Sequence, residues 1–222
     1  CAAYTQVDRA ETEQDKCMQI NGLGTRNVAI NTEEVRSKLI YISTDYVFDG
    51  KKKTPYFEWD KPNPLSVYGL SKYWGEQMVQ QFSSRFFILR TAWLYGQSND
   101  NFIKTIQKLA KEKDEISIVD DQIGSPTSTV ELSKTISSLI NTELYGIYHA
   151  SCEGECSWFD FAQEIIRLSV LNIKINPIPT KDFPLPAKRP KYSYLENYML
   201  KSQNLYKMLD WQLALNNYFT NE

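Results

Sequence analysis

The chain has 222 residues, a formal net charge of −2, a sequence pI of about 5.6 and 42% hydrophobic residues. This length and apolar content suffice for one large domain or two small ones with a sizeable core. The near-neutral charge argues against a nucleic-acid partner, and no apolar run approaches the roughly 20 residues that span a bilayer.

Cysteine usage indicates a reducing compartment. The four cysteines, Cys1, Cys17, Cys152 and Cys156, make no disulfide framework at this length. A zinc site would need tighter pairs or more ligands than the single histidine offers, so we expect no metal. Free thiols, with no signal peptide opening the chain, predict a cytoplasmic location.

The first half of the chain alternates between helices and strands. After a strand end and loop at residues 1–5, the predicted elements are a helix at 10–31, a strand at 38–43, a helix at 67–82 and a strand at 85–90. Gly22 and Gly24 weaken the middle of the first helix. This β-α-β-α-β order predicts an α/β fold with a Rossmann-like parallel sheet and right-handed crossovers.

The pattern becomes more varied after Gly96. The remaining predicted elements are helices at 101–113, 129–141 and 157–171, strands at 116–119 and 146–150, and an ordered extended loop at 176–190. Ser157 and Asp160 form a capping box for the last helix. His149 is interpreted as a structural strand residue. The aromatic side chains in the first turn of the last helix, Trp158, Phe159 and Phe161, are interpreted as core.

The most informative pair is Tyr68 and Lys72, which share one face of the predicted 67–82 helix. A phenol beside a fixed ammonium has its anion stabilised, so the pKa of Tyr68 is expected to fall from about 10. Such a tyrosine can exchange a proton with a carbonyl or alcohol oxygen, while Thr44, at the end of the preceding strand, holds that oxygen. The arrangement predicts reduction of a ketone or oxidation of an alcohol.

The bare Tyr-x-x-x-Lys pair is weak evidence, because in a chain with 14 tyrosines it arises roughly once by chance. Its context makes it specific: the turn at 63–66 precedes the helix, and a buried strand lies upstream. The chain has no Gly-x-Gly-x-x-Gly after a strand, and Gly22-Leu23-Gly24 lies within a predicted helix. The loop that normally holds a dinucleotide pyrophosphate is therefore not seen in this sequence.

Five blocks in order carry a resemblance to a known family. The blocks span residues 1–11, 43–50, 63–72, 89–96 and 119–127. Their first residues are Cys1-Ala2-Ala3-Tyr4-Thr5, Ser43-Thr44-Asp45-Tyr46-Val47-Phe48-Asp49-Gly50, Asn63-Pro64-Leu65, Leu89-Arg90-Thr91-Ala92-Trp93 and Val119-Asp120-Asp121-Gln122-Ile123-Gly124. Together they resemble the dTDP-4-dehydrorhamnose reductase family of extended short-chain dehydrogenases/reductases, from Cys1 to about Asn197. The resemblance implies reduction of the 4-keto group of dTDP-4-dehydro-L-rhamnose by NADPH or NADH, giving dTDP-L-rhamnose for cell-surface polysaccharide.

The resemblance also implies residue roles. Tyr68 is the proton donor, Lys72 holds the nicotinamide ribose, and Thr44 orients the keto oxygen. The implied cofactor contacts are Ala3, Tyr4, Thr5, Ser43, Tyr68 and Lys72, and the implied substrate contacts are Thr44, Asp45, Tyr46, Trp93, Asn101 and Arg189. Residues 1–96, with 129–150 returning to them, would be the remaining Rossmann domain, and 97–128 with 151–222 the sugar-nucleotide region. The expected partner is the dTDP-sugar, with a homodimer left open and no nucleic acid or membrane.

The family's pattern begins with a strand, a glycine-rich turn and two β-α units, roughly sixty residues that this sequence does not contain. We therefore expect a truncated product or a fragment of a longer protein. Such a chain should expose an apolar sheet edge and bind cofactor poorly. Made alone, it should show no useful reductase activity and poor solubility.

Beside the reductase, an inactive remnant stays open as an interpretation of the chain as it stands, and so do two other functions. One is another nucleotide-sugar short-chain enzyme, an epimerase or dehydratase, against which Thr44-Asp45-Tyr46-Val47-Phe48 and Trp93 argue. The other is a non-enzymatic member similar to the regulatory subunit of methionine adenosyltransferase. Retention of Thr44, Tyr68 and Lys72 together favours the enzyme.

Overall fold

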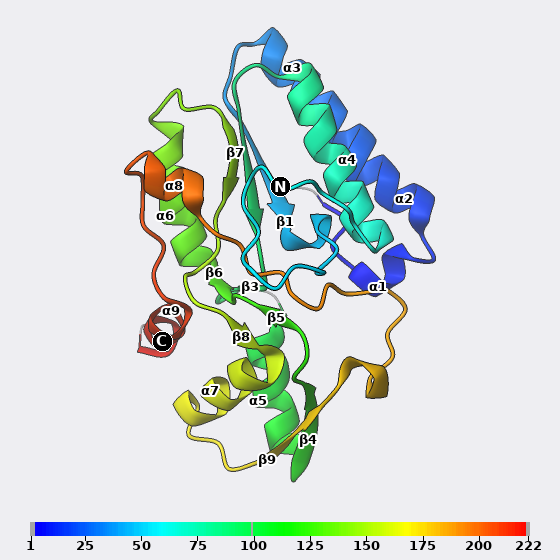
Figure 1. Cartoon of the computed structure of the whole chain (residues 1–222), viewed down its shortest axis with the longest axis vertical. Helices are drawn as coiled ribbons and strands as arrows, with labels where there is room; N and C mark the ends of the chain where they lie inside the picture. Colours follow the sequence, from blue (N-terminus) through cyan, green and yellow to red (C-terminus); the bar gives the residue numbers. More distant parts are fainter. Residues whose placement is uncertain (1–2, 99, 221–222) are drawn as a thin grey trace.

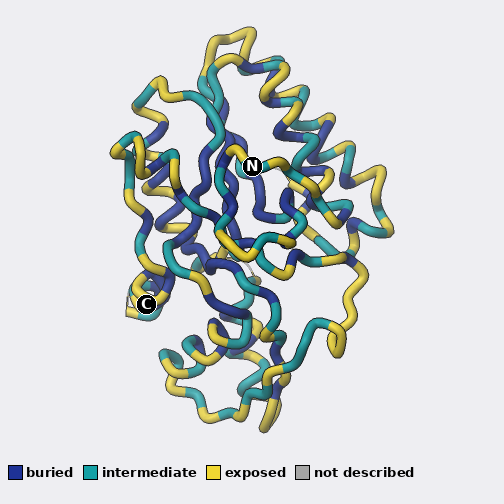
Figure 2. The backbone as a smooth tube through the Cα atoms, in the orientation of Figure 1, coloured by how far each residue is buried: buried dark blue, intermediate teal, exposed yellow. Residues whose placement is uncertain are grey.

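The computed structural model describes residues 3–98 and 100–220 and confirms an α/β architecture around a parallel sheet. Three strands form that sheet, in the order β1 (Leu39–Thr44), β2 (Phe86–Thr91) and β7 (Gly146–His149). Ile42 pairs with Leu89, and Leu89 pairs with Tyr148, so the carboxyl ends of the strands lie at one edge. The strands form the buried centre of the upper half of the molecule (Figures 1 and 2).

Both faces of the sheet are covered, which explains why β2 is an almost continuous apolar run. Helices α3 (Thr25–Glu34) and α4 (Val67–Phe82) cover one face, where Tyr41, Val79 and Ile88 share a buried cluster. The other face packs on a larger cluster that contains Phe87 and Leu89. Helices α6 (Thr129–Ile140), α8 (Tyr198–Ser202) and α9 (Trp211–Thr220) contribute to this larger cluster (Figure 1).

Helix α4 has the predicted bounds and an unusual buried face. Ser66 caps it by accepting a hydrogen bond from the backbone N–H of Gly69 at 3.1 Å. Its buried face is small or polar rather than apolar, and includes Lys72, Gly75 and Glu76. A Cβ at position 75 would lie 2.1 Å from the hydroxyl oxygen of Tyr41, so glycine is what permits α4 to approach the sheet this closely.

The predicted 10–31 helix is divided in the structure. Its parts are α1 (Val7–Ala10), α2 (Gln14–Met18), a π-helical turn (Gln19–Gly24) and α3. The π turn spans both glycines, and a Cβ on Gly22 would overlap the ring of Trp74 on α4. The π-helical turn therefore lies where this helical segment packs against α4.

The lower part of the molecule carries short strand pairs and two amphipathic helices (Figure 1). The strands are β3 (Leu94–Tyr95) with β6 (Thr127–Ser128), β4 (Glu115–Val119) with β9 (Lys174–Ile178), and β5 (Ile123–Gly124) with β8 (Cys156–Ser157). The helices are α5 (Phe102–Glu112) and α7 (Trp158–Leu168). Ser157 and Asp160 make the predicted capping box of α7, which ends at Leu168 rather than near Leu171.

The prediction of an extended loop at 176–190 is wrong for the first residues of that segment. Residues 176–178 belong to β9, which pairs in parallel with β4, although Pro177 lies inside it. Proline is tolerated there because, among the residues that the structure describes, β9 pairs with β4 alone, so the nitrogen of Pro177 can face away from its partner. A short 3-10 turn, Thr180–Asp182, follows, and the rest of the loop is irregular as predicted.

Candidate active site

The carboxyl ends of β1 and β2 open into a cavity of about 290 Å³. The cavity is lined by Ala3, Thr5, Ile42, Ser43, Thr44, Tyr68, Lys72, Thr91, Ala92, Trp93 and Leu94. The three predicted catalytic residues, Thr44, Tyr68 and Lys72, therefore meet in one place. The strand ends supply Thr44, and the first two turns of α4 supply the other two.

Tyr68 is half-buried in the cavity wall, and its surroundings keep the phenol protonated. Burial raises the pKa of Tyr68 to about 12, although hydrogen bonding with Thr44 opposes the rise. The ring of Tyr46 packs edge-on against that of Tyr68, with centroids 5.8 Å apart. Tyr68 is thus a phenol, not a phenolate, at neutral pH, which is the form that a proton donor requires.

The expectation that Lys72 lowers the pKa of Tyr68 is wrong for this structure. Burial lowers the pKa of Lys72 itself to about 8, with Glu76 opposing the shift. The Lys72 ammonium lies 4.1 Å from the centroid of the Tyr41 ring, a cation–π contact. Since desolvation is the largest cause at both residues, the spacing along the helix was a poor guide to the pKa of Tyr68.

Thr44 and Asp45 form a hydrogen-bonded pair at the end of β1. The hydroxyl of Thr44 donates to Oδ1 of Asp45 at 3.0 Å and accepts from the backbone N–H of Tyr46 at 3.2 Å. Ser193 donates to Oδ2 of Asp45 at 2.6 Å. Burial raises the pKa of Asp45 to about 6, and the hydrogen bonds from Ser193 and Thr44 hold it from rising further.

The predicted cofactor-side residues border the same cavity. Ala3 and Thr5 line both it and an adjoining cavity of about 240 Å³, which Tyr4 also lines. The backbone N–H and C=O of Tyr4 bind the side-chain amide of Asn21 at 2.8 and 3.0 Å. Ser43 lines the reaction cavity, and its hydroxyl donates to the buried carboxylate of Glu76.

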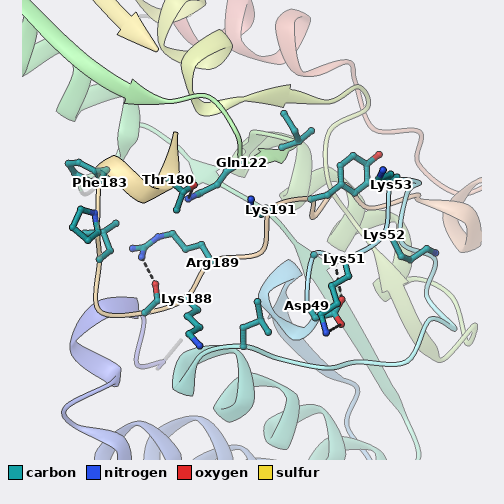
Figure 3. A pocket seen from close by; sticks show the side chains of 17 residues that line it. Asp49, Lys51, Lys52, Lys53, Gln122, Thr180, Phe183, Lys188, Arg189 and Lys191 are labelled. Carbon is teal, nitrogen blue, oxygen red and sulfur yellow. Dashed lines mark hydrogen bonds and ion pairs between the residues drawn. The ribbon is translucent and has the colours of Figure 1, made fainter. Parts of the chain in front are cut away.

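Of the other predicted substrate contacts, Trp93 lines the reaction cavity and Tyr46 packs against Tyr68, whereas Arg189 and Asn101 do not line this cavity. Arg189 borders two larger cavities of about 740 and 730 Å³, and Figure 3 shows the first of these. Its guanidinium forms a two-pronged ion pair with Asp8, at 3.0 and 2.8 Å. Asn101 caps α5 by accepting from the backbone N–H of Lys104 at 3.2 Å.

Sequence reasoning missed three charged or polar partners of the site. Asp8 holds Arg189, Ser193 holds Asp45, and Glu76 anchors Ser43. The first two pairs join residues 181 and 148 positions apart, and no local pattern signals such contacts. Glu76 could have been found from the sequence, because it lies one turn beyond Lys72 on the same face of the predicted helix.

Within the described ranges, 3–98 and 100–220, no group of histidine, cysteine and carboxylate side chains could hold a metal ion. In the same part of the chain, no helix has the length and apolar character needed to cross a membrane. Cys17, Cys152 and Cys156 are buried free thiols. His149 is fully buried and bonds the backbone carbonyl of Glu196 through Nδ1 at 3.1 Å, which suits the structural role predicted for it.

Known proteins match the whole chain. The RmlD substrate-binding domain family matches residues 1–222. The dTDP-4-dehydrorhamnose reductase of Aggregatibacter actinomycetemcomitans is 39% identical, over 97% of this chain and 78% of that protein. The spore coat polysaccharide biosynthesis protein SpsK of Bacillus subtilis is 39% identical, over 98% of this chain and 76% of that protein.

A solved structure agrees with these relatives. The dTDP-4-dehydrorhamnose reductase of Bacillus anthracis, in complex with NADP, superposes with a TM-score of 0.98 at 46% identity, over 100% of this chain and 79% of that one. The resemblance drawn from the five sequence blocks is thereby confirmed. The chain belongs to the RmlD substrate-binding domain family.

Proposed function

We propose that the protein containing this chain catalyses the reduction of the 4-keto group of a dTDP-4-dehydro-6-deoxy sugar, dTDP-4-dehydro-L-rhamnose, with NADPH or NADH. The observation that carries the proposal is the convergence of Thr44, Tyr68 and Lys72 on one cavity at the carboxyl edge of the sheet. Relatives that carry the reductase name match almost the entire chain, and one of them is described with NADP. The product would serve polysaccharide synthesis, as the name of the Bacillus subtilis relative suggests.

The chain's own residues supply the proton and the positioning. The hydroxyl of Thr44 binds the keto oxygen and fixes the carbonyl toward Tyr68. The phenol of Tyr68, whose pKa of about 12 keeps it protonated, gives its proton to the alkoxide that forms on that oxygen. The carboxylate of Asp45, buried beside Thr44, accepts hydrogen bonds from neighbouring sugar hydroxyls.

The cavity residues fit a nicotinamide nucleotide. Lys72 presents an ammonium and Thr5 a hydroxyl on the lining, which suits the hydroxyls of a ribose, and Ala3 leaves room beside them. A bound nicotinamide supplies the hydride, because no side chain can. Lys72 would hold the ribose, and Ala3, Tyr4, Thr5 and Ser43 would border the path of the cofactor.

The nucleotide part of the substrate would lie along the 183–189 segment. Arg189 borders both outer cavities and offers the planar, two-pronged donor that suits a diphosphate. Binding there would exchange Asp8 for phosphate oxygens as the partner of the guanidinium. Tyr46 would contact the thymine. Asn101, committed to capping α5, would contribute through the position of that helix.

We further infer the organisation and setting of the protein. Residues 1–96 with 129–150 would bind the cofactor, and 97–128 with 151–222 the sugar nucleotide. The three buried thiols suit a reducing compartment, and hence the cytoplasm. A homodimer and the absence of nucleic-acid binding remain predictions from the sequence.

The test is to incubate the protein with dTDP-4-dehydro-L-rhamnose and NADPH and to follow the loss of reduced-cofactor absorbance. We expect dTDP-L-rhamnose as the product, identified by mass spectrometry and nuclear magnetic resonance. Epimerised or dehydrated sugar nucleotide without net cofactor oxidation would replace the reductase with the alternative enzyme class. A stable stoichiometric complex with a methionine adenosyltransferase, without turnover, would favour the non-enzymatic role.

A further inference from the structure

Trp93 adopts a backbone conformation that tryptophan rarely takes. Its φ is +47°, in the left-handed region that normally suits glycine. A residue persists there only where its surroundings over-determine the conformation, and such residues gather at functional sites. Because Trp93 also lines the reaction cavity beside Tyr68, the question is what holds it in place.

The side chain of Trp93 contacts a second indole, that of Trp158. The rings of Trp93 and Trp158 stack with centroids 3.6 Å apart and planes 11° apart. The backbone of Gly124 also packs on the Trp93 ring, since a Cβ there would come within 2.7 Å of it. The carbonyl of Trp93 accepts a hydrogen bond from the backbone N–H of Thr127 at 3.2 Å.

Trp158 is itself rigidly placed and faces a different cavity. It is the first residue of α7 and directly follows Ser157, the N-cap of the capping box that fixes the start of the helix. Its ring contacts that of Phe102, with centroids 4.6 Å apart. Trp158 lines the outer cavity of about 730 Å³, so the indole pair separates that cavity from the reaction cavity.

We propose that Trp158 is a positioning residue for the reductase reaction: its stacked indole holds Trp93 in the left-handed conformation and against the sugar-binding side of the reaction cavity. The inference rests on the proposed function. Trp158 does not touch the reacting atoms. It fixes the wall that the sugar contacts, and it couples that wall to the outer cavity in which the nucleotide part would lie. Its removal should therefore weaken binding of the sugar nucleotide and leave the cofactor unaffected.

The test compares Trp158→Ala and Trp158→Phe with the parent chain, with Trp59→Ala as a matched control. Trp59 is 62% exposed and stacks on Phe57 away from both cavities. Circular dichroism reports the exciton signal of the closely stacked indoles, and steady-state kinetics separates KM for the sugar nucleotide, KM for NADPH and kcat. Thermal unfolding of each variant shows that it is folded at the assay temperature.

We expect Trp158→Ala to lose the exciton signal and to raise KM for the sugar nucleotide roughly tenfold or more, because small misplacements of a binding wall are costly. KM for NADPH should stay within about twofold of the parent value. Trp158→Phe, which keeps a stacking ring, should restore most of the affinity, and Trp59→Ala should change neither quantity. Trp158→Ala added to Trp93→Ala should cost little more than Trp93→Ala alone.

An unchanged KM in a folded Trp158→Ala variant that has lost the exciton signal would overturn the inference. So would an equal loss in Trp59→Ala, or a rise in KM for NADPH of the same size. A full-length parent protein with no turnover would instead reject the proposed function. In that case the affinity of dTDP-L-rhamnose, measured by calorimetry for the parent and for Trp158→Ala, decides whether Trp158 organises the sugar-nucleotide site.

Discussion

Arg90 and Glu76 form a two-pronged ion pair inside the core, between β2 and α4. Nε of Arg90 donates to Oε1 of Glu76 at 3.0 Å, and Nη2 donates to Oε2 at 2.8 Å. Their side chains are 2% and 0% exposed. Because Glu76 also accepts from Ser43 and Arg90 donates to the carbonyl of Glu58 at 3.1 Å, the pair ties the strand end beside the active site to the catalytic helix.

Replacing Glu76 by Met should destabilise the protein strongly. The substitution leaves the guanidinium of Arg90 buried without its carboxylate, which typically costs about 3–5 kcal/mol. Urea unfolding measures the loss. The matched control is Glu164→Met, which breaks a more exposed pair with Arg167 on α7 and should cost about 1 kcal/mol or less. A loss at Glu76 no larger than at Glu164 would contradict the assignment.

Tyr68→Phe should abolish most turnover while the fold and substrate binding persist. The ring is retained and only the proton-donating hydroxyl is removed, so kcat should fall by about 10²–10⁴. Oxidation of NADPH followed by absorbance gives kcat and KM. Tyr198→Phe, at a half-exposed tyrosine of α8, is the control. A Tyr68→Phe rate within threefold of the parent would remove Tyr68 from the mechanism.

Lys72→Met should change how stability depends on pH. The pKa of Lys72 falls from 10.5 to about 8 on folding, so between these values the unfolded chain binds the extra proton. The free energy of unfolding of the parent should therefore rise, relative to that of the variant, by about 3 kcal/mol from pH 8 to pH 10.5. Urea unfolding at pH 7.5, 9 and 10 measures this difference. A constant difference would show that Lys72 is not desolvated. The control is Lys108→Met, at an exposed position of α5. Its free energy of unfolding should differ from that of the parent by the same amount at all three pH values.

Ser193→Ala should move the acid side of the pH–activity profile to higher pH. The hydroxyl of Ser193 stabilises the charged form of Asp45, so its loss raises the pKa of Asp45 above its present value of about 6. Since ionised Asp45 is the form that accepts sugar hydroxyls, kcat/KM should fall away at a higher pH than in the parent. A pH profile from 4.5 to 8 measures the shift, and Ser133→Ala on the exposed face of α6 should leave the profile unchanged.

The raised pKa of Asp45 affects the stability of the protein in the opposite direction from its activity as the pH rises. The pKa of Asp45 is higher in the folded chain than its ordinary 3.8, so the folded state retains the proton between about pH 4 and 6. Asp45 therefore contributes stability that is present at low pH and is lost as the pH rises through about 6. In Ser193→Ala this loss should extend to higher pH, and urea unfolding across the range would detect it.

Local signals were enough to place the catalytic helix. The turn at 63–66 and the cap at Ser66 gave the bounds of α4 correctly, and the apolar runs gave β1 and β2 to within one residue. The conjunction of Thr44, Tyr68 and Lys72 followed from parallel-strand topology. Strand β9 was missed because prolines favour irregular structure, and its pairing with β4 is decided by a partner almost 60 residues away.

The electrostatic character of the site was not predictable from spacing. Tyr68 and Lys72 share a helix face, yet each pKa is governed by burial, which depends on how closely α4 approaches the sheet. That approach depends in turn on Gly75 meeting Tyr41, a contact between residues 34 positions apart in the chain. The left-handed backbone of Trp93 and the stacking of its ring on Trp158 likewise have no signature in neighbouring residues.

The hydrogen of the Thr44 hydroxyl is already committed to Asp45, and this has a consequence for selectivity. The hydroxyl can donate a hydrogen bond to a ketone oxygen only if it turns away from Asp45. The buried carboxylate then lacks one of its hydrogen-bond donors. A ligand hydroxyl placed next to the carbonyl can replace that donor. The site should therefore favour hydroxy-ketones over simple ketones of the same size, since only the former leave every buried acceptor satisfied after the exchange.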